Sequence, residues 1–308
     1  MVNEILNERK LELARRKVLK EKIVGNTSFI IITIIVLFGA FIMIFPYLWM
    51  FLTALKSANE AMSLVPTFLP KDPNWGIFTE ALTSSRVNFL HSMGNTLIIE
   101  LLVIIVGTFI STLCAFAFAK MKFRFKKTIL IILMTSMMIP YAAVMLPQYQ
   151  VYMNLGITSS DSSFINLLPL ILPGLFGNIS MTFFLITAMQ NSIHDALIDE
   201  AKVEGCSWFR IYWNIALPLS KPAIAAQIIF WFVGIWNDYF APSLYLQRSD
   251  NWTMQVALTM LNSSSSGSGQ DLPLLFAAAF LSSIPMIILF ILCRKMFINV
   301  NANSGIKG

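Results

Sequence analysis

The sequence predicts an all-α integral membrane protein with six transmembrane helices and with its N- and C-termini in the cytoplasm. Composition gives the first reason: 56% of the 308 residues are apolar, and the mean hydropathy is +0.70. Charged residues make up 12% of the chain, about half the share found in soluble domains. The second reason is a set of six long apolar runs. The third is the uneven distribution of Lys and Arg among the connections between these runs.

Each of the six runs is long enough to cross a bilayer, for which a helix needs about 20 apolar residues. Because backbone groups in lipid must be hydrogen-bonded within their own segment, each run is expected to be helical. The predicted spans are 28–54, 95–119, 128–153, 164–190, 222–247 and 272–293. The prolines expected to kink or interrupt them are Pro46, Pro140, Pro147, Pro169, Pro173 and Pro285.

Basic residues set the orientation of the spans, since Lys and Arg accumulate in cytoplasmic connections. Of the 22 Lys and Arg residues, 18 lie in the N-terminal tail, the connections after the second and fourth spans, and the C-terminus. Those on the opposite side are Lys56, Lys71, Arg86 and Arg248. Topology therefore explains the net charge of +6, and nucleic-acid binding is not indicated.

This arrangement predicts one membrane domain with two short cytoplasmic extensions. Residues 1–27 are expected to form a basic cytoplasmic helix, 28–298 the six-span domain, and 299–308 a cytoplasmic tail. The last external connection contains NSSSSGSGQD, residues 262–271. Its Ser/Gly-rich composition predicts a flexible polar linker.

The cytoplasmic connection after the fourth span, residues 191–220, is unusual because it is acidic; we call it the elbow. Its charged side chains between residues 191 and 207, with histidine counted as neutral, are Lys202 and the acids Asp195, Asp199, Glu200 and Glu204. Like-charge pairs four residues apart disfavour an isolated helix by about a few tenths of a kcal/mol each. The elbow is therefore either a solvated helix or an element that docks into a groove of another protein, and the residues alone leave both open.

Local signals divide the elbow into two helices. Ser192 and Asp195 match a capping box, which predicts that the first helix begins near Ile193. Its expected apolar stripe consists of Ala196, Leu197, Ala201 and Val203. Gly205 is placed to adopt the left-handed conformation that ends a helix.

The second helix of the elbow is expected to be short. Ser207 should cap it, and it should run through WFRIYWNIAL before a stop at Pro218. Pro218 together with Pro222 then marks the entry into the fifth span.

The stretch DEAKVEGCSWFRIYWNIALP, residues 199–218, resembles a cytoplasmic loop of the permease subunits of binding-protein-dependent ABC importers. That loop carries an acid, two alanines, a glycine four positions beyond them, and an Ile/Leu-rich stretch ending in Leu-Pro. The matching residues here are Asp199, Ala201, Gly205, Ile215, Leu217 and Pro218. The chain departs from the pattern at Glu200, where the first alanine is usual, and at His194, where a proline is usual.

Four other stretches resemble the carbohydrate branch of that family. They are CAFAFAKMKF (114–123), MIPYAAVMLPQYQVYMNLGITSS (138–160), GIWNDYFAPSLYL (234–246) and SGIKG (304–308). The resemblance runs from about residue 90 to the end and is nearest to the maltose-type second permease subunit. It implies the type I ABC importer permease fold, a bacterial inner or plasma membrane location, and import of a carbohydrate, with oligosaccharides fitting better than monosaccharides.

The resemblance also implies three partners: a cytoplasmic ATPase dimer, a different permease subunit that completes a heterodimer, and an extracytoplasmic sugar-binding protein. The residues it assigns to coupling with the ATPase are Asp199, Glu200, Ala201, Glu204, Gly205, Leu217 and Pro218. The sequence contains no G-x-x-x-x-G-K-[ST] phosphate loop, so this chain is not expected to be an enzyme, and ATP and Mg²⁺ should be bound by the ATPase. No cofactor or metal site is expected in this chain, because its histidines and cysteines lack metal-ligand spacing.

Two ionisable residues lie inside predicted spans, where they are costly and therefore indicate function. Glu100 lies just inside the outer end of the second span, and Asp238 lies roughly 25 Å from the cytoplasmic side at 1.5 Å per residue. Asp238 is flanked by Trp236, Asn237 and Tyr239. Together these five residues form a candidate substrate pathway, because aromatic faces, amides and carboxylates suit a sugar. An aromatic belt with Asn237 and Asp238 satisfying a bent helix explains the same residues, and both readings stay open.

Two other classes of membrane protein fit part of the pattern. A proton-coupled secondary transporter could use Glu100 and Asp238 as carriers, and it would transport without ATP. A membrane scaffold or sensor could use the elbow only to recruit a cytoplasmic partner. The intramembrane polar groups and the kinked spans favour a transporter over a scaffold.

Overall fold

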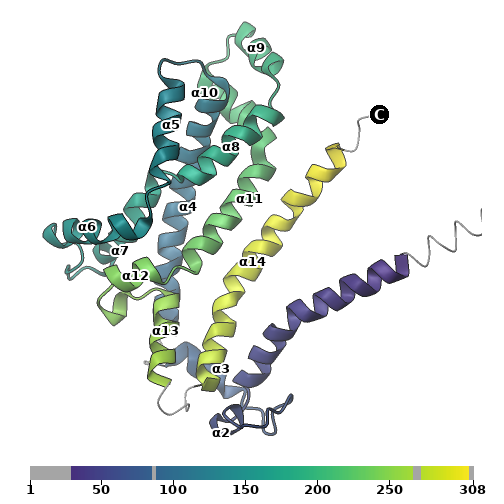
Figure 1. The fold of residues 1–308 in the computed structure, drawn as a ribbon, viewed down its shortest axis with the longest axis vertical. Coiled ribbons are helices and arrows are strands. Elements are labelled where there is room, and N and C mark those ends of the chain that lie inside the picture. Colours follow the sequence, from purple (N-terminus) through teal and green to yellow (C-terminus); the bar gives the residue numbers. More distant parts are fainter. Residues whose placement is uncertain (1–28, 85–87, 266–271, 305–308) are drawn as a thin grey trace, which may run out of the picture.

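The computed structural model describes residues 29–84, 88–265 and 272–304, which form helices joined by short connections (Figure 1). The predicted basic helix at 1–27, residues 266–271 of the predicted linker and the last four residues of SGIKG lie outside these ranges.

Five segments within the described ranges are long and apolar enough to cross a membrane. They are Phe29–Ala54, Phe89–Lys120, Ser163–Ser192, Trp208–Tyr245 and Leu272–Cys293. A sixth crossing is present if the bent pair Lys126–Ser136 and Tyr141–Asn154 is counted as one span. The predicted all-α class with six spans is therefore confirmed, with the third span broken.

The helices after the first span carry the labels of Figure 1. In chain order, the first of them are α2 (Ala58–Ala61), α3 (Gly76–Thr83), α4 (Phe89–Lys120), α5 (Lys126–Ser136), α6 (Tyr141–Asn154), α7 (Ser163–Leu175) and α8 (Ile179–Ser192). They continue with α9 (Asp195–Val203), α10 (Trp208–Ile211), a π-helical turn (Tyr212–Ala216), α11 (Leu217–Trp236), α12 (Phe240–Tyr245), a 3₁₀ turn (Ser249–Asn251), α13 (Met254–Ser265) and α14 (Leu272–Ser304).

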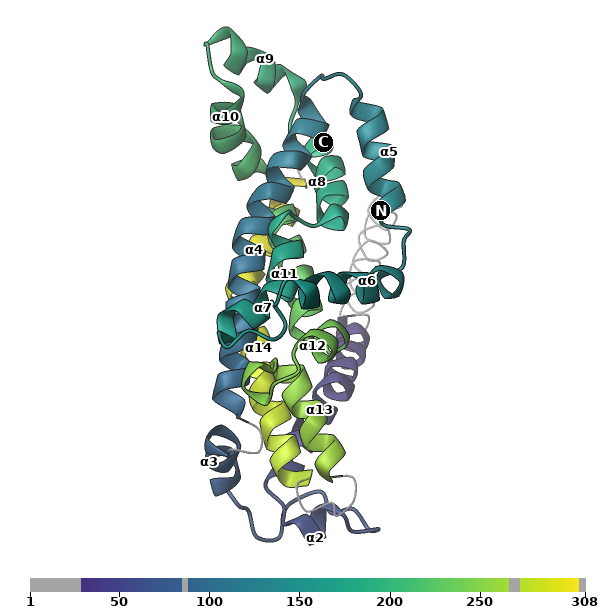
Figure 2. The ribbon, with the colours of Figure 1, turned by 90° about the vertical axis from the view of Figure 1, so that its left-hand side faces the viewer.

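Helix α4 is the central helix of the molecule, and α7, α8 and α11 pack along it (Figures 1 and 2). The helices approach closely at Gly107, where an added Cβ would overlap the carbonyl oxygen of Gly174 in α7 and the indole of Trp231 in α11. A Cβ on Gly174 would in turn lie 2.5 Å from Cγ1 of Val103. Small residues let membrane helices approach closely, since packing rather than the hydrophobic effect holds them together.

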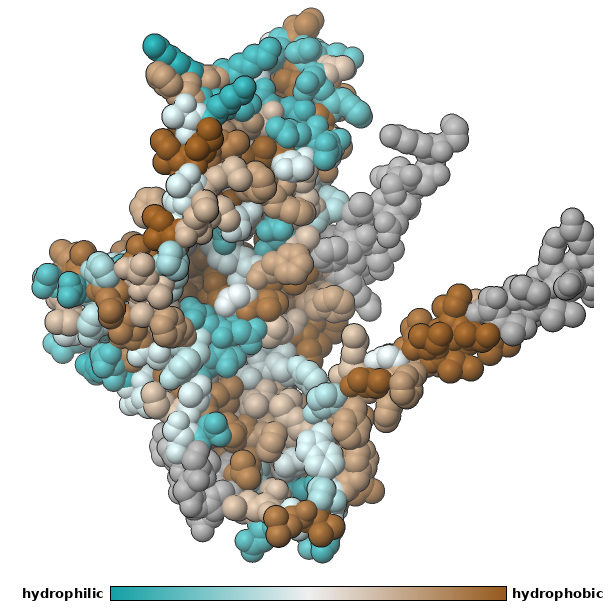
Figure 3. Space-filling model, viewed as in Figure 1, coloured by the Kyte–Doolittle hydropathy of each residue, from teal (hydrophilic) through white to brown (hydrophobic). Residues whose placement is uncertain are grey.

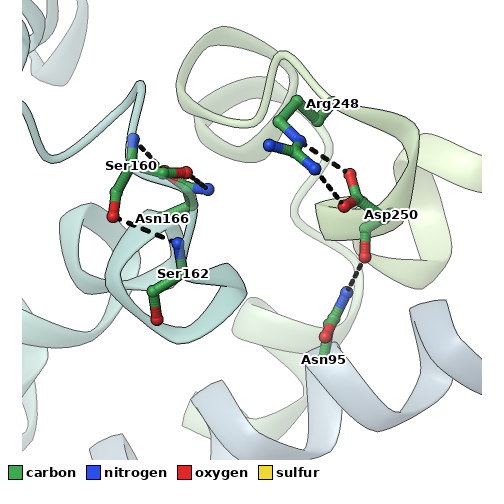
Figure 4. A network of polar contacts seen from close by, with 6 residues as sticks. All are labelled: Asn95, Ser160, Ser162, Asn166, Arg248 and Asp250. Atoms are coloured by element: carbon green, nitrogen blue, oxygen red, sulfur yellow. Dashed lines mark hydrogen bonds and ion pairs between the residues drawn. The ribbon is translucent and has the colours of Figure 1, made fainter.

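The outer end of α4 is fixed to the loop between α12 and α13 (Figure 4). The Asn95 amide donates to the backbone carbonyls of Asp250, at 3.1 Å, and Trp252, at 3.2 Å. The Arg248 guanidinium binds the Asp250 carboxylate through two bonds of 3.1 and 2.8 Å. This loop is therefore ordered by α4 and by its own ion pair.

Three spans are interrupted: the third between α5 and α6, the fourth between α7 and α8, and the fifth between α11 and α12. Helices α5 and α6 meet at an angle of 88°, and Pro140 caps α6 in an extended conformation. Figure 2 shows α6 crossing the long axis of the molecule at mid-height, whereas α5 runs along that axis. The predicted third span is consequently bent, as a proline in this position favours. The predicted fifth span is also broken, because α11 ends at Trp236 and α12 begins at Phe240.

Two predicted boundaries are wrong. No helix stops at Pro218, because α10 continues through the π-helical turn into α11, and Pro218 occupies the first turn of α11. A proline lacks the backbone donor that an α-helical turn needs, and a π turn accommodates such a break in the hydrogen-bond ladder. Residues 262–265 of the predicted flexible linker form the end of α13.

The surface changes character along the long axis (Figure 3). Hydrophilic side chains gather over α9 and α10 at one end, and the first helix is covered by apolar side chains such as Phe29, 71% exposed, and Val36, 63% exposed. A second hydrophilic patch lies at mid-height, where α11 meets α12. The apolar covering suits lipid, and the mid-height patch places polar groups within the spanning region.

The contact at Gly107 predicts a strong effect of a single methyl group. In the purified protein, Gly107→Ala should lower stability by about 1–3 kcal/mol, because the backbone of α7 and the ring of Trp231 must move apart. Gly94→Ala on the same helix is the matched control, since no atom lies within 4 Å of its added Cβ. Thermal unfolding followed by size-exclusion chromatography measures both, and equal stability of the two variants would contradict the close contact.

Candidate functional site

The elbow forms a compact helical projection at the inner end of the molecule (Figure 1). Its first helix, α9, begins at Asp195 with His194 as the N-cap, so the predicted capping box at Ser192 is wrong. Ser192 is the last residue of α8, and Ile193 is extended and buried. The Asp195 carboxylate does not fold back on the helix end, because it binds a lysine of α4 instead.

The predicted apolar stripe of α9 also needs correction. Ile198 and Ala201 are the buried residues of the helix, and they join a core formed with α4 and α8. Leu197 and Val203 instead point outward, with 39% and 89% of their surfaces exposed. Ile198 and Ala201 lie about one turn apart, and their burial sets the rotation of α9 about its own axis. In this orientation Leu197 and Val203 lie on the outer face of the helix.

Three kinds of contact attach the elbow to α4. The Lys120 ammonium lies 2.7 Å from Oδ1 of Asp195, and this hydrogen bond together with the positive charge lowers the pKa of that carboxyl. The Thr112 and Tyr212 hydroxyls are hydrogen-bonded at 2.9 Å. Phe116 packs against the Tyr212 ring, with centroids 5.7 Å apart. The elbow is therefore joined to α4 by an ion pair, a hydrogen bond and an aromatic contact.

The turn between α9 and α10 has the conformation that the sequence predicts. Gly205 has φ +77, and its N–H donates to the Lys202 carbonyl while the next N–H donates to the Ala201 carbonyl. This pair of bonds is the Schellman arrangement that terminates a helix. The predicted cap at Ser207 is also present, with its hydroxyl accepting from the Arg210 N–H at 3.3 Å.

The outer surface of the elbow combines acids with apolar side chains. The coupling candidates Asp199, Glu200, Glu204, Gly205 and Pro218 are exposed, whereas Ala201 is buried and Leu217 is half-buried. Within the part of the chain that the structure describes, the three acids of this set form no ion pair. Two aromatic rings add to the surface, with Phe209 58% and Trp213 55% exposed.

Glu100, the first pathway candidate, is 1% exposed on α4. Neither carboxyl oxygen has a hydrogen-bond partner among the described residues. The neighbouring Ile99 and Val103 pack into an apolar cluster with Leu167 and Ile171 of α7. A buried, unpartnered carboxyl is costly, which marks this position as a functional candidate.

The other four candidates surround the break between α11 and α12. Trp236 is 1% exposed, and its indole N–H donates to the Ser282 carbonyl at 3.1 Å, so it belongs to the core in this conformation. The Asn237 amide donates to the Val233 carbonyl at 2.9 Å. Oδ1 of Asp238 accepts the N–H groups of Phe240, at 3.0 Å, and Ala241, at 3.3 Å. Asn237 and Asp238 thus satisfy the backbone of the broken helix, as one of the two open interpretations expects.

Polar groups on α6 and α12, which the sequence interpretation did not single out, lie beside this break. Tyr141 and Gln148 of α6 approach Tyr245 of α12, with Oη–Oη and Oη–Oε1 distances of 3.3 and 3.2 Å. Gln148 also donates to the Tyr152 hydroxyl at 3.1 Å. The spacing of 141, 148 and 152 places these side chains on one face of a helix, and this spacing was the available signal.

A comparison with protein families matches residues 107–298 to the binding-protein-dependent transport system inner membrane components. The chain belongs to this family. It is therefore the permease component of an ABC transporter rather than its ATPase, and it is a multi-pass protein of the inner membrane. Membership decides against the proton-coupled secondary transporter and the scaffold.

Relatives of this permease match nearly its whole length. The arabinooligosaccharides transport system permease protein AraQ of Halalkalibacterium halodurans is 28% identical over 90% of this chain and 96% of its own. The galactooligosaccharides transport system permease protein GanQ of Bacillus subtilis is 29% identical over 88% of this chain and 93% of its own. The solved structure of a bacterial ABC transporter involved in the import of the acidic polysaccharide alginate shares the fold, with a TM-score of 0.71, 20% identity, and coverage of 87% of this chain and 95% of that chain.

The permease elbow gives a prediction at Gly205, where the backbone conformation and not space excludes a side chain. Gly205→Val should strain the turn by about 1 kcal/mol and reorient α9, because a residue with a side chain disfavours the positive φ of this position. Steric overlap is not the cause, since no atom lies within 4 Å of the added Cβ. Insertion and subunit assembly should stay near normal, and substrate uptake should fall about tenfold or more, since a misplaced elbow costs about 1.4 kcal/mol of coupling or more.

Gly156→Val is the matched control for this variant. Gly156 also has positive φ, at +69, with no atom near its added Cβ, and it lies between α6 and α7, away from the elbow. Uptake measured beside membrane abundance separates the two variants. Equal uptake in both would contradict a special role for the elbow turn.

Proposed function

We propose that this permease carries an oligosaccharide across the inner membrane and that its elbow docks into a cleft of a cytoplasmic ATPase. The substrate class rests on the relatives, whose names refer to arabinooligosaccharides, galactooligosaccharides and maltodextrin. Substrate would be delivered by an extracytoplasmic binding protein and would pass the candidates Glu100, Asn237, Asp238 and Tyr239.

The coupling proposal rests on the apolar side chains that are exposed on the elbow. A solvated helix has no need of Val203 at 89% exposure together with exposed Phe209 and Trp213. Apolar side chains at the centre and charged groups around them are typical of a docking surface. The inner face of α9 is already fixed to α4, so the outer face remains for a partner.

The subunit composition is part of the same proposal. A different permease subunit would complete a heterodimer, and two ATPase copies would bind ATP and Mg²⁺, so that this chain binds neither. Closure of the ATPase dimer would displace α9, and the contacts of Lys120 and Tyr212 would pass the displacement to α4.

Purification of the tagged chain from its native membrane tests the assembly. We expect a complex with one copy of a different permease, two ATPase copies, and ATP hydrolysis that the sugar-loaded binding protein stimulates. An active homodimer of this chain without an ATPase would contradict the proposal.

Charge reversal on the elbow tests the docking surface. Glu200→Lys should reduce the amount of ATPase retained during purification, because it places a cation where basic or dipolar groups of the ATPase are expected. The reduction should be larger at low salt, where surface charges are least screened. Glu80→Lys, an exposed acid on α3 at the outer side, is the matched control. Equal retention in both variants at every salt concentration would contradict docking through this face.

A further inference from the structure

The third and the fifth spans, both interrupted, meet at mid-height of the molecule, where α6 lies beside α12 (Figure 2). The α5–α6 break exposes one stretch of non-helical backbone, and the α11–α12 break exposes another. Irregular backbone within a membrane is tolerated where protein covers it or where it lines a water-filled cavity, and broken helices form the binding sites of many transporters.

Buried side chains hold the polar groups at this junction in place. Tyr245 is 1% exposed and Tyr152 is 9% exposed. Their hydroxyls bind opposite ends of the Gln148 amide, and Tyr245 also reaches the Tyr141 hydroxyl. The ring of Tyr149 packs against Tyr245, with centroids 6.2 Å apart. The orientation of the more exposed side chains is therefore fixed by a buried network.

Three groups at the junction remain available to a ligand. Tyr141 is 45% exposed, and its hydroxyl lies within electrostatic range of Asp238. Oδ1 of Asp238 is occupied by two backbone N–H groups, whereas its Oδ2 has no partner among the described residues. Tyr149 is partly buried, and its hydroxyl likewise has no partner in the described part of the chain.

We infer that Tyr141, Tyr149 and Asp238 form a subsite for a neutral sugar ring in this subunit. The inference rests on the proposed function and specifies where this chain touches the oligosaccharide. Aromatic faces pack against the apolar C–H surface of a sugar, and a carboxylate oxygen accepts its hydroxyl protons. Neither α6, α12 nor the break at 237–239 contains Lys or Arg, so an acidic sugar would meet the Asp238 charge uncompensated.

Uptake by the complete transporter in proteoliposomes tests the subsite. The probes are radiolabelled arabinotriose, galactotriose and maltotriose, each supplied with the system's binding protein. Tyr141→Ala should lower uptake about tenfold, equivalent to about 1.4 kcal/mol of sugar binding, while stimulated ATP hydrolysis stays within about twofold. Asp238→Asn, which keeps the acceptor for both N–H groups, should lower uptake in the same way. Tyr47→Ala is the control, a tyrosine 40% exposed on the first helix.

Labelling of a cysteine at the same position separates contact with the sugar from a structural effect. In a variant without Cys114, Cys206 and Cys293, Tyr141→Cys should react with a charged, membrane-impermeant thiol reagent. The transported trisaccharide should protect it. Absence of labelling would place Tyr141 against lipid and overturn the subsite, as would labelling that the sugar does not affect.

The outcomes also separate this inference from the proposed function. If the wild-type transporter imports a trisaccharide and both variants import it normally, the subsite is wrong and the importer assignment stands. If the wild-type transporter imports none of the three sugars, the proposed function and the subsite both fail.

Discussion

The close contact of α4 with α7 and α11 at Gly107 is the constraint on which the arrangement of the bundle depends. It brings backbone against backbone at Gly174 and an indole ring against the same point, so three spans share one crossing. The helix that passes through this crossing carries the elbow at its inner end, through Lys120, and the outer loop at its outer end, through Asn95. One helix therefore contacts both the elbow and the outer loop.

The interruptions in the third and fifth spans position the polar side chains at mid-height of the molecule. A continuous third or fifth helix would satisfy its own backbone and leave no reason for polar side chains at mid-height. The bend before α6 and the break before α12 instead require Asp238 as a cap and bring tyrosines of two helices together. Glu100 differs from these groups, because its carboxyl is buried without a partner in the described structure.

Features governed by local chemistry could be predicted from the sequence. The spans follow from hydropathy, the turn at Gly205 from its lack of a Cβ, and the cap at Ser207 from its hydroxyl. The capping box at Ser192 failed because Lys120, 75 positions from Asp195 in sequence, takes the carboxylate. The tyrosine network could not be predicted for the same reason, since Tyr141 and Tyr245 are 104 residues apart in the chain.

The central claim is that the elbow and α4 move as one body when the ATPase closes. Pulsed electron paramagnetic resonance between spin labels at Val203, on the elbow, and Ile105, an exposed residue of α4, tests it most directly. The distance should be the same in the nucleotide-free transporter and in the ATP–vanadate state, within the about 1–2 Å of ordinary helix shifts. A change of about 5 Å or more, comparable to one helical turn, would show that α9 moves independently and would contradict the account.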